Sequence, residues 1–306
     1  MAIDKTISIL GLGGMGSAIA RAYTKAGYKT IVWNRSPAKA HALVADAAVP
    51  VASATECIRA SPLVITCLLN VEAFQDVLNK ADQGAGVGRI LIDYTSASPD
   101  DITNSQATAL KHSFSTYIRG AIETYPAYVG MPESLFYYSG DQKIFASIEE
   151  TLKILGMAVY LGEDVLFATL QECTLGIFFF GFSQAFLQTM AFYNSTKMYM
   201  PGGAQRLLKE TLLPIFMQDY SRLYGELARQ IDEKDYVSQA SDGAPLSVLQ
   251  DTLGCLIQTS EKLGISSNAL HPMYELVQAR ISQGGAAEEM SSLVETITTR
   301  SRSDLL

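Results

Sequence analysis

The sequence predicts an α/β fold: a doubly wound parallel sheet in the first half, joined by a long helix to an all-helical second half. Two observations indicate this division. Short apolar runs alternate with helical patterns as far as residue 163, which is typical of parallel strands covered by helices on both faces. Beyond that point the strand-like runs end and long amphipathic stretches follow.

Apolar, β-rich runs give the expected strands of the first half. They occupy residues 6–10, 29–33, 49–53, 63–69, 89–96, 116–123, 134–140 and 157–162. Helices are expected over 17–28, from 37 onward, and over 55–60, 71–81, 99–112 and 142–156. Ser36 is placed to cap the helix that begins at Pro37. We therefore expect a first domain over residues 1–163.

Four long amphipathic runs predict a helical second domain over residues 164–306. They lie at 166–197, 203–232, 245–264 and 270–283. The first approaches the length of a membrane span. Gln184 and Gln188 interrupt its apolar residues, and Lys197 is the only basic residue nearby, which disfavours insertion. We expect this helix to be buried in a protein core or a subunit interface.

The composition excludes several classes of partner. The chain of 306 residues has a net charge of −8 and no block of Lys or Arg, so no nucleic-acid partner is expected. Cys57, Cys67, Cys173 and Cys255 have neither CxxC nor His-paired spacing, so no metal site is expected. The apolar stretch before the first glycine turn is too short for a signal peptide. We expect a soluble, cytoplasmic protein with no membrane partner.

The turn GLGGMG carries the clearest functional signal. Gly11, Gly13 and Gly16 form GxGxxG after a strand and before a helix, with a second strand about twenty residues on. Gly11 permits the tight turn, Gly13 lets the backbone approach a pyrophosphate, and Gly16 lets the helix pack on the strand. N–H groups at the helix start would bind the phosphates. These features favour a dinucleotide site of the Rossmann type over a glycine turn without a ligand.

The end of the second strand indicates which dinucleotide binds. NAD sites usually carry Asp or Glu there for the ribose 2′-hydroxyl, whereas this chain has Asn34, Arg35 and Ser36, with Lys39 one turn later. A guanidinium and a hydroxyl would hold a 2′-phosphate that a carboxylate would repel. The sequence therefore favours NADPH/NADP+. An ordinary helix start with a solvated arginine is the less favoured alternative.

Taken together, the motifs resemble those of a known family. GLGGMG, VWNRSPAKA, CLLN, DYTSASPDD, YSGD and LGED in the first half, and ARQIDEKDY in the second, resemble the β-hydroxyacid dehydrogenase superfamily. Within it, they resemble the imine reductases and reductive aminases of the fungal type. The resemblance implies an NADP-binding Rossmann domain like that of 6-phosphogluconate dehydrogenase and a helical domain. It also implies a homodimer, in which a domain swap lets each partner complete the other's active site.

The resemblance extends the cofactor site beyond the glycine turn and the end of the second strand. It adds the segment after the fourth strand and Ser96 after the fifth. The expected cofactor-binding residues are Gly11, Leu12, Gly13, Gly14, Met15, Gly16, Asn34, Arg35, Ser36, Lys39, Cys67, Leu68, Leu69 and Ser96.

The expected chemistry depends on Glu172. In the hydroxyacid dehydrogenases a catalytic lysine follows a glycine-containing turn near the start of the long helix, and the resemblance puts Glu172 at that position. Imine reductases usually carry Asp, or sometimes Tyr, there. A carboxylate would stabilise a cationic iminium or give its proton to an imine. Phe178, Phe179, Phe180 and Phe182 would offer an aromatic face to a cation, although most are expected to be core residues.

Two positions depart from the resemblance. Reductive aminases commonly have Tyr where this chain has Phe180, and Asn where it has Ser96. Tyr125 and Tyr128, in the segment that corresponds to the substrate loop, are candidates for the lost hydroxyl, with surface or packing roles equally open. Gln250 resembles a substrate-facing glutamine, with an exposed helix glutamine as the alternative. The expected catalytic residues are Glu172, Ser96 and Tyr125, and the expected substrate pocket includes Tyr128, Phe180 and Gln250.

The function that follows is an NADPH-dependent imine reductase. It would transfer hydride to an imine or iminium carbon to give an amine, within a biosynthetic pathway, from a small-molecule imine, amine or ketone. Two alternatives stay open. A β-hydroxyacid dehydrogenase or ketone reductase is disfavoured by the missing lysine, and an NADP-binding protein without catalytic activity would explain the missing tyrosine.

Overall fold

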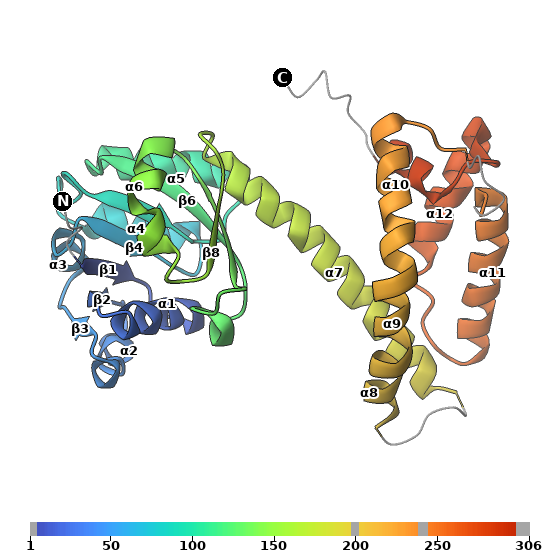
Figure 1. Ribbon diagram of the computed structural model, residues 1–306, viewed down its shortest axis with the longest axis horizontal. Coiled ribbons are helices and arrows are strands. Elements are labelled where there is room, and N and C mark those ends of the chain that lie inside the picture. Colours follow the sequence, from blue (N-terminus) through green and yellow to red (C-terminus); the bar gives the residue numbers. More distant parts are fainter. Residues whose placement is uncertain (1–4, 197–201, 238–243, 298–306) are drawn as a thin grey trace. The chain divides into compact units, whose positions relative to one another are not determined.

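The structure is a computed structural model that describes residues 5–196, 202–237 and 244–297 (Figure 1). The chain divides into two compact units, Met1–Phe178 and Phe179–Leu306, and each is described by itself. This division falls inside a long helix, because the first turns of that helix pack on the first unit. The domain boundary expected at residue 163 stays a prediction.

An eight-stranded sheet forms the centre of the first unit. Its strands are β1 (Thr6–Leu10), β2 (Lys29–Trp33), β3 (Val49–Pro50), β4 (Leu63–Thr66), β5 (Ile90–Asp93), β6 (Thr116–Glu123), β7 (Leu135–Ser139) and β8 (Met157–Gly162). They are ordered β3-β2-β1-β4-β5-β6-β7-β8. The strands from β1 to β6 are parallel, whereas β7 pairs antiparallel with β6 and parallel with β8. The predicted parallel sheet is confirmed for six strands and is extended by an oppositely directed pair.

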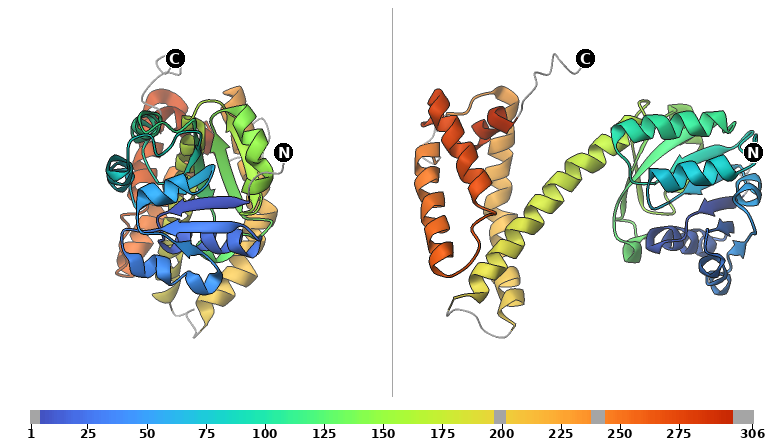
Figure 2. Two further views of the ribbon diagram at one scale, coloured as in Figure 1. Left: turned by 90° about the vertical axis from the view of Figure 1, so that its left-hand side faces the viewer. Right: turned by 180° about the vertical axis from the view of Figure 1, so that it is seen from behind.

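Helices cover both faces of the sheet (Figures 1 and 2). They are α1 (Gly14–Lys25), α2 (Pro37–His41), α3 (Ala54–Arg59), α4 (Val71–Lys80), α5 (Pro99–Lys111) and α6 (Gln142–Leu152). One buried cluster joins α1 and α6 to the sheet, for example through Tyr23 and Leu152. A second cluster on the other face joins α3, α4 and α5, for example through Phe74 and Ile102. Burial on both faces explains why the strands are apolar throughout.

Side-chain caps fix where most of these helices begin. Ser98 accepts from the backbone of Asp101 in a capping box at α5, and Asn70 accepts from Ala73 at α4. The expected cap at α2 is wrong, because Ser36 stands at the cap position without a side-chain bond. Asn34 holds this turn instead, since its Nδ2 donates to the Ser36 carbonyl over 3.2 Å. The Ser36 hydroxyl therefore takes no part in starting the helix.

The second unit is helical, as predicted. Its helices are the end of α7 (Leu166–Asn194), α8 (Gly203–Leu207), α9 (Leu213–Ile215), α10 (Ser221–Glu233), α11 (Leu246–Lys262), α12 (His271–Arg280) and α13 (Val294–Ile297). The segment expected as one helix over 203–232 is interrupted by π-helical turns at Leu208–Leu212 and Phe216–Tyr220. Pro214 lies between them and has no N–H to donate, which accounts for the irregularity. The helices α11 and α12 pack together around Leu246, Val277 and Leu293.

The helix α7 is apolar around most of its circumference. Among the described residues it is the one helix with the length and composition of a membrane span, with a mean hydropathy of 1.4 over its best window. Only 6% of that window is buried, and Phe180 and Leu187 are 72% and 65% exposed. Burial in the core of a single chain, one of the two expected settings, is therefore wrong. One such helix is weak support for membrane insertion, because helices packed in soluble proteins pass the same test.

The close approach of Gly120 to Tyr94 gives a test of how the sheet is packed. A Cβ atom on Gly120 would lie 2.3 Å from Cε1 of Tyr94, and the Tyr94 hydroxyl is held 2.7 Å from that of Tyr138. We expect Gly120→Ala to lower the free energy of unfolding by about 1–3 kcal/mol, because the ring cannot yield without losing this bond. Chemical denaturation followed by circular dichroism measures the change. In the control Gly14→Ala, the added methyl group lies 3.7 Å from Pro126 and should have little effect.

Candidate active site

A cleft opens at the carboxyl end of the sheet, where the strand order reverses between β1 and β4. Its volume is about 670 Å³. Its walls are the segments that follow β1, β2 and β4, together with parts of α3 and α4. The lining residues are Gly11, Leu12, Gly13, Gly14, Met15, Gly16, Trp33, Asn34, Arg35, Ser36, Lys39, Ala52, Ser53, Ala54, Thr55, Cys67, Leu68, Leu69, Ala73, Asp76, Val77 and Lys80. Every expected cofactor-binding residue except Ser96 lies in this lining.

The glycine turn is built for a close ligand. Gly11 has φ +99°, and a Cβ atom on it would lie 2.3 Å from the Cys67 carbonyl oxygen. A Cβ on Gly16 would lie 2.0 Å from the Gly11 carbonyl oxygen. A Cβ atom on Gly13, in contrast, would meet nothing within 4 Å. The outer two glycines are therefore required by the packing of the chain itself, whereas the middle one leaves space that a phosphate group can enter.

The start of α1 offers unpaired donors to that space. No side chain caps this helix, whose N-cap residue is Gly13. The loop before it is fixed by Asn34, because the Leu12 N–H donates to Asn34 Oδ1 over 3.0 Å. The free N–H groups and the positive end of the helix dipole favour an anion here.

Two cations stand at the end of β2. Arg35 and Lys39 are exposed, and neither has an ion-pair partner within the described residues. The other cation of the cleft, Lys80, is paired with Asp76 at 2.7 Å. Positive charge is therefore unneutralised on the side of the cleft where a 2′-phosphate would be distinguished from a 2′-hydroxyl.

The side chain of Cys67 lines the cleft, and its thiol is unreactive. Burial raises its pKa to about 12, and the negative charge of Asp93 adds to this effect. The thiol is therefore protonated at neutral pH and is not a nucleophile. No cluster of metal-binding side chains occurs in the part of the chain that the structure describes.

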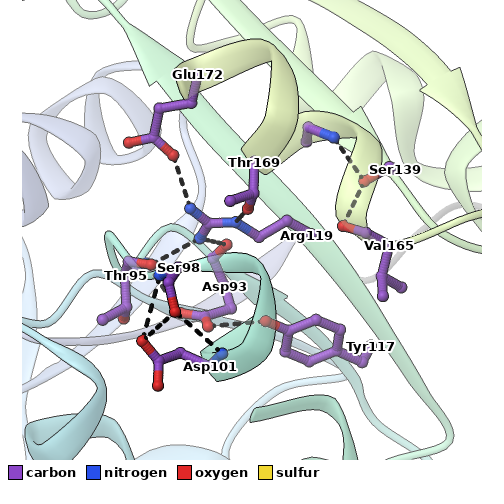
Figure 3. Close-up of polar contacts among 11 residues, drawn as sticks. Asp93, Thr95, Ser98, Asp101, Tyr117, Arg119, Ser139, Val165, Thr169 and Glu172 are labelled. Carbon is purple, nitrogen blue, oxygen red and sulfur yellow. Dashed lines mark hydrogen bonds and ion pairs between the residues drawn. The ribbon is translucent and has the colours of Figure 1, made fainter. Parts of the chain in front are cut away.

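A buried arginine organises the next part of the site (Figure 3). Arg119 on β6 is 0% exposed. Its Nη1 donates to the carbonyl oxygens of Asp93 and Thr95, over 2.9 and 2.8 Å, and its Nε donates to Thr169 Oγ1 over 2.9 Å. Its Nη2 donates to Glu172 Oε2 over 2.9 Å. One side chain thus ties the end of β5 to the first turns of α7.

Glu172 is held by this arginine and also reaches the surface. Its side chain is 30% exposed, while that of Arg119 is wholly buried. The ion pair gives the buried guanidinium of Arg119 an anionic partner, without which its burial would be costly. The start of α7 is itself fixed by Ser139, whose hydroxyl donates to the Val165 carbonyl and accepts from the Ala168 N–H (Figure 3). The position of Glu172 is therefore set by the sheet.

Asp93 completes the network below Arg119. It is fully buried, and its carboxylate accepts from Thr66 Oγ1, from the Thr95 N–H and from the Tyr117 hydroxyl over 2.8 to 2.9 Å. Burial, followed by the negative charge of Asp93, raises the pKa of Tyr117, so the phenol remains a donor. With three donors on its carboxylate, Asp93 has a structural role.

The remaining predicted residues fall into two groups. Ser96 is exposed in the segment after β5 and lies outside the lining of the cleft, one residue beyond Thr95, whose Oγ1 accepts from the Leu68 N–H. Tyr125 and Tyr128 are 61% and 51% exposed, and their rings meet edge to face with centroids 6.5 Å apart. Pro126, between them, lies close to Gly14 of the glycine turn. Phe180 and Gln250 belong to the second unit.

Sequence reasoning missed Arg119 and its neighbour Glu123. The signal was available in TYIRGAIE, where charged residues interrupt an otherwise apolar strand. A charge at a buried strand position requires a partner of opposite sign. The identity of that partner, Glu172, does not follow from the strand alone.

Comparison with known proteins agrees with this architecture. Residues 6–162 match the NAD binding domain of 6-phosphogluconate dehydrogenase, and residues 167–299 match the C-terminal domain of NADPH-dependent reductive aminase-like proteins. Over 298 residues the chain is 33% identical to an NADPH-dependent reductive aminase of Aspergillus oryzae, with 96% of this chain and 97% of the relative covered.

Solved structures show the same likeness. A reductive aminase from Aspergillus terreus, in complex with NADPH and ethyl levulinate, superposes with a TM-score of 0.88 at 30% identity, covering 96% of this chain and 99% of that one. An imine reductase from a Pseudomonas species gives a TM-score of 0.88 at 27% identity, with the same coverage. The likeness in fold and in sequence extends over nearly the whole chain, and the chain therefore belongs to the family of NADPH-dependent reductive aminases and imine reductases.

Proposed function

We propose that this protein is an NADPH-dependent imine reductase that converts an imine or iminium into an amine. The observation that carries the proposal is the carboxylate of Glu172, anchored by Arg119 at the carboxyl end of the sheet in a member of this family. When bound, NADPH supplies a hydride to the imine carbon and is oxidised to NADP+, and a proton at nitrogen completes the amine. The substrates are small molecules, such as imines or the amines and ketones that form them.

The residues of the cleft fit the cofactor. The open space at Gly13 and the uncapped start of α1 suit a pyrophosphate. Arg35, Ser36 and Lys39 suit a 2′-phosphate, and Leu68 and Leu69 offer apolar contact further along the cleft. We assign Ser96 a contact with the nicotinamide side of the site, although it lies outside the lining of the cleft.

Glu172 acts on the charge of the substrate. Oε2 is fixed by Arg119, and no hydrogen bond within the described residues occupies Oε1, which leaves that oxygen for a cationic C=N group. A fixed carboxylate stabilises positive charge more effectively than water does, because it needs no reorganisation. We propose Tyr125 and Tyr128 as further substrate contacts, and Phe180 and Gln250 of the second unit stay predicted substrate contacts.

Activity assays with imines and with hydroxyacids distinguish imine reduction from two other functions. A β-hydroxyacid dehydrogenase or ketone reductase would oxidise hydroxyacids with NADP+, and a non-catalytic protein would bind NADPH without turnover. Oxidation of NADPH with a cyclic imine such as 2-methyl-1-pyrroline, but no reduction of NADP+ with hydroxyacids, supports imine reduction. Binding without turnover across a panel of imines and ketone–amine pairs would overturn it.

Glu172→Gln should lower kcat for 2-methyl-1-pyrroline by about 100-fold or more, since it removes the charge that faces the iminium. The amide oxygen can still accept from Arg119, so the fold and the affinity for NADPH should be kept. Steady-state kinetics and a fluorescence titration with NADPH measure the two effects. The matched control is Glu163→Gln, an exposed residue just before α7, which should behave as the unaltered protein. An unchanged kcat in Glu172→Gln would remove this residue from the mechanism.

Arg35→Ala should weaken NADPH binding by about 10- to 100-fold, the value of a charged hydrogen bond to phosphate, and leave NADH binding nearly unchanged. Isothermal titration with both cofactors gives the ratio. Arg21→Ala is the control, because Arg21 pairs with Asp46 on the surface and does not line the cleft. Equal weakening of both cofactors would contradict a role in 2′-phosphate recognition.

We further propose that the protein works as a homodimer in the cytoplasm. Exposed apolar residues on α7, among them Ile177, Phe180 and Leu187, give a second copy a surface to cover. Analytical ultracentrifugation should give twice the monomer mass of 33.2 kDa. Leu187→Asp should shift the equilibrium toward monomer, whereas a monomeric unaltered protein would contradict the proposal.

A further inference from the structure

A second carboxylate, Glu123, lies near Glu172. It is the last residue of β6, and the parallel register of β5 and β6 pairs Asp93 with Arg119, so Glu123 extends beyond the carboxyl end of β5. Side chains alternate along a strand, so Arg119, Ala121 and Glu123 point to the same face. This is the face on which the first turns of α7 lie, because Arg119 contacts both Thr169 and Glu172 of that helix.

The side chain of Glu123 lacks the partners that a buried carboxylate needs. Its Oε1 is buried and has no hydrogen-bond partner within the described residues. The residue as a whole is half-buried, so the side chain still communicates with solvent. A charged oxygen without a donor is costly at such a position, whereas a protonated carboxyl group is not, and it can itself donate to a ligand.

The neighbouring groups favour the same protonation state. On this face lie Arg119 on β6, Tyr137 on β7 opposite Ala121, and Glu172 on α7, while the residue directly opposite Glu123 is Leu135. The positive charge of Arg119 is engaged by Glu172. Burial, and then the negative charge of Glu172, raises the pKa of Glu123. The protonated form of Glu123 is therefore favoured beside the ion pair of Glu172 with Arg119.

We propose that Glu123 is the acid that gives the proton to the imine nitrogen, while Glu172, paired with Arg119, remains a carboxylate that stabilises the iminium. This inference rests on the proposed imine reduction and assigns its proton. It also accounts for Phe180, which offers no hydroxyl at the position where reductive aminases commonly have tyrosine.

The step balances without a further reagent. The O–H bond of Glu123 breaks and an N–H bond forms at the imine nitrogen, which gives an iminium and the Glu123 carboxylate. The iminium carbon then accepts the hydride with its electron pair, and the product is a neutral amine. Glu123 regains a proton from water at its exposed side. Two carboxylates next to one iminium also hold the cation until the carbon is reduced.

A permanently charged substrate separates this role from a structural one. The neutral imine 2-methyl-1-pyrroline needs a proton, whereas the 1,2-dimethyl-1-pyrrolinium ion carries its charge on a methylated nitrogen and needs none. In Glu123→Gln we expect kcat/KM to fall about 100-fold or more for the pyrroline and to change little for the pyrrolinium. Glu172→Gln should lower kcat/KM for both substrates, because both pass through the cation that Glu172 stabilises.

The pH dependence of the rate with pyrroline also tests whether Glu123 is the acid. A raised pKa means that the acid form of Glu123 persists to higher pH, and the rate with pyrroline is lost as pH rises through that pKa. At a pH where free pyrroline is neutral, Glu123→Asp should recover part of the lost rate. Equal losses for pyrroline and pyrrolinium in Glu123→Gln, or no loss for pyrroline, would overturn the assignment. An unaltered protein that reduces neither substrate would instead overturn the proposed function.

Infrared spectroscopy of the cofactor-free protein gives a readout that does not depend on turnover. With carbon-13 glutamate labelling, a protonated carboxyl band should persist into the pH range of activity and should be missing from Glu123→Gln. In Glu172→Gln the same band should disappear at lower pH, because the neighbouring negative charge that raises the pKa of Glu123 is gone. A spectrum in which Glu123→Gln removes no such band would contradict the proposal even if the variant were inactive.

Discussion

The candidate active site depends on one ion pair, between the wholly buried Arg119 and the partly exposed Glu172. A guanidinium at zero exposure is tolerated only because two carbonyl oxygens, a hydroxyl and a carboxylate take up its donors. The contact between the sheet and the start of α7 is therefore strongly specified, because the buried guanidinium needs these partners. The ion pair that positions Glu172 is therefore also the interaction that allows an arginine to be buried in β6.

The ion pair also separates the charges of the site. Arg119 is wholly buried and Glu172 is partly exposed, so the positive charge lies inside the protein and the negative charge reaches toward the surface. Glu123 receives no such support, because the guanidinium is already engaged. Two side chains of identical chemistry thus acquire different properties from their contacts alone, which is the usual way in which one site supplies both an acid and a carboxylate.

The local parts of this arrangement could be predicted from the sequence, and the long-range parts could not. Gly11 and Gly16 could be identified because the turn that they form lies within a few residues of each, and the lining of the cleft follows from them. Ser36 did not cap α2, and the side chain that holds this turn is that of Asn34, which donates to the Ser36 carbonyl. The pairing of Arg119 with Glu172 joins residues 53 positions apart and depends on where α7 crosses the sheet, which no local pattern encodes.

The length of Glu172 can be understood from this geometry. A family member with aspartate at this position has one methylene group fewer between backbone and carboxylate. In this chain the acid must reach Arg119 with Oε2 and still leave Oε1 open, and the longer side chain allows both from a helix fixed by Ser139. The lysine of the hydroxyacid dehydrogenases could not occupy the same position, because it would bring a second cation against a guanidinium that already needs an anion.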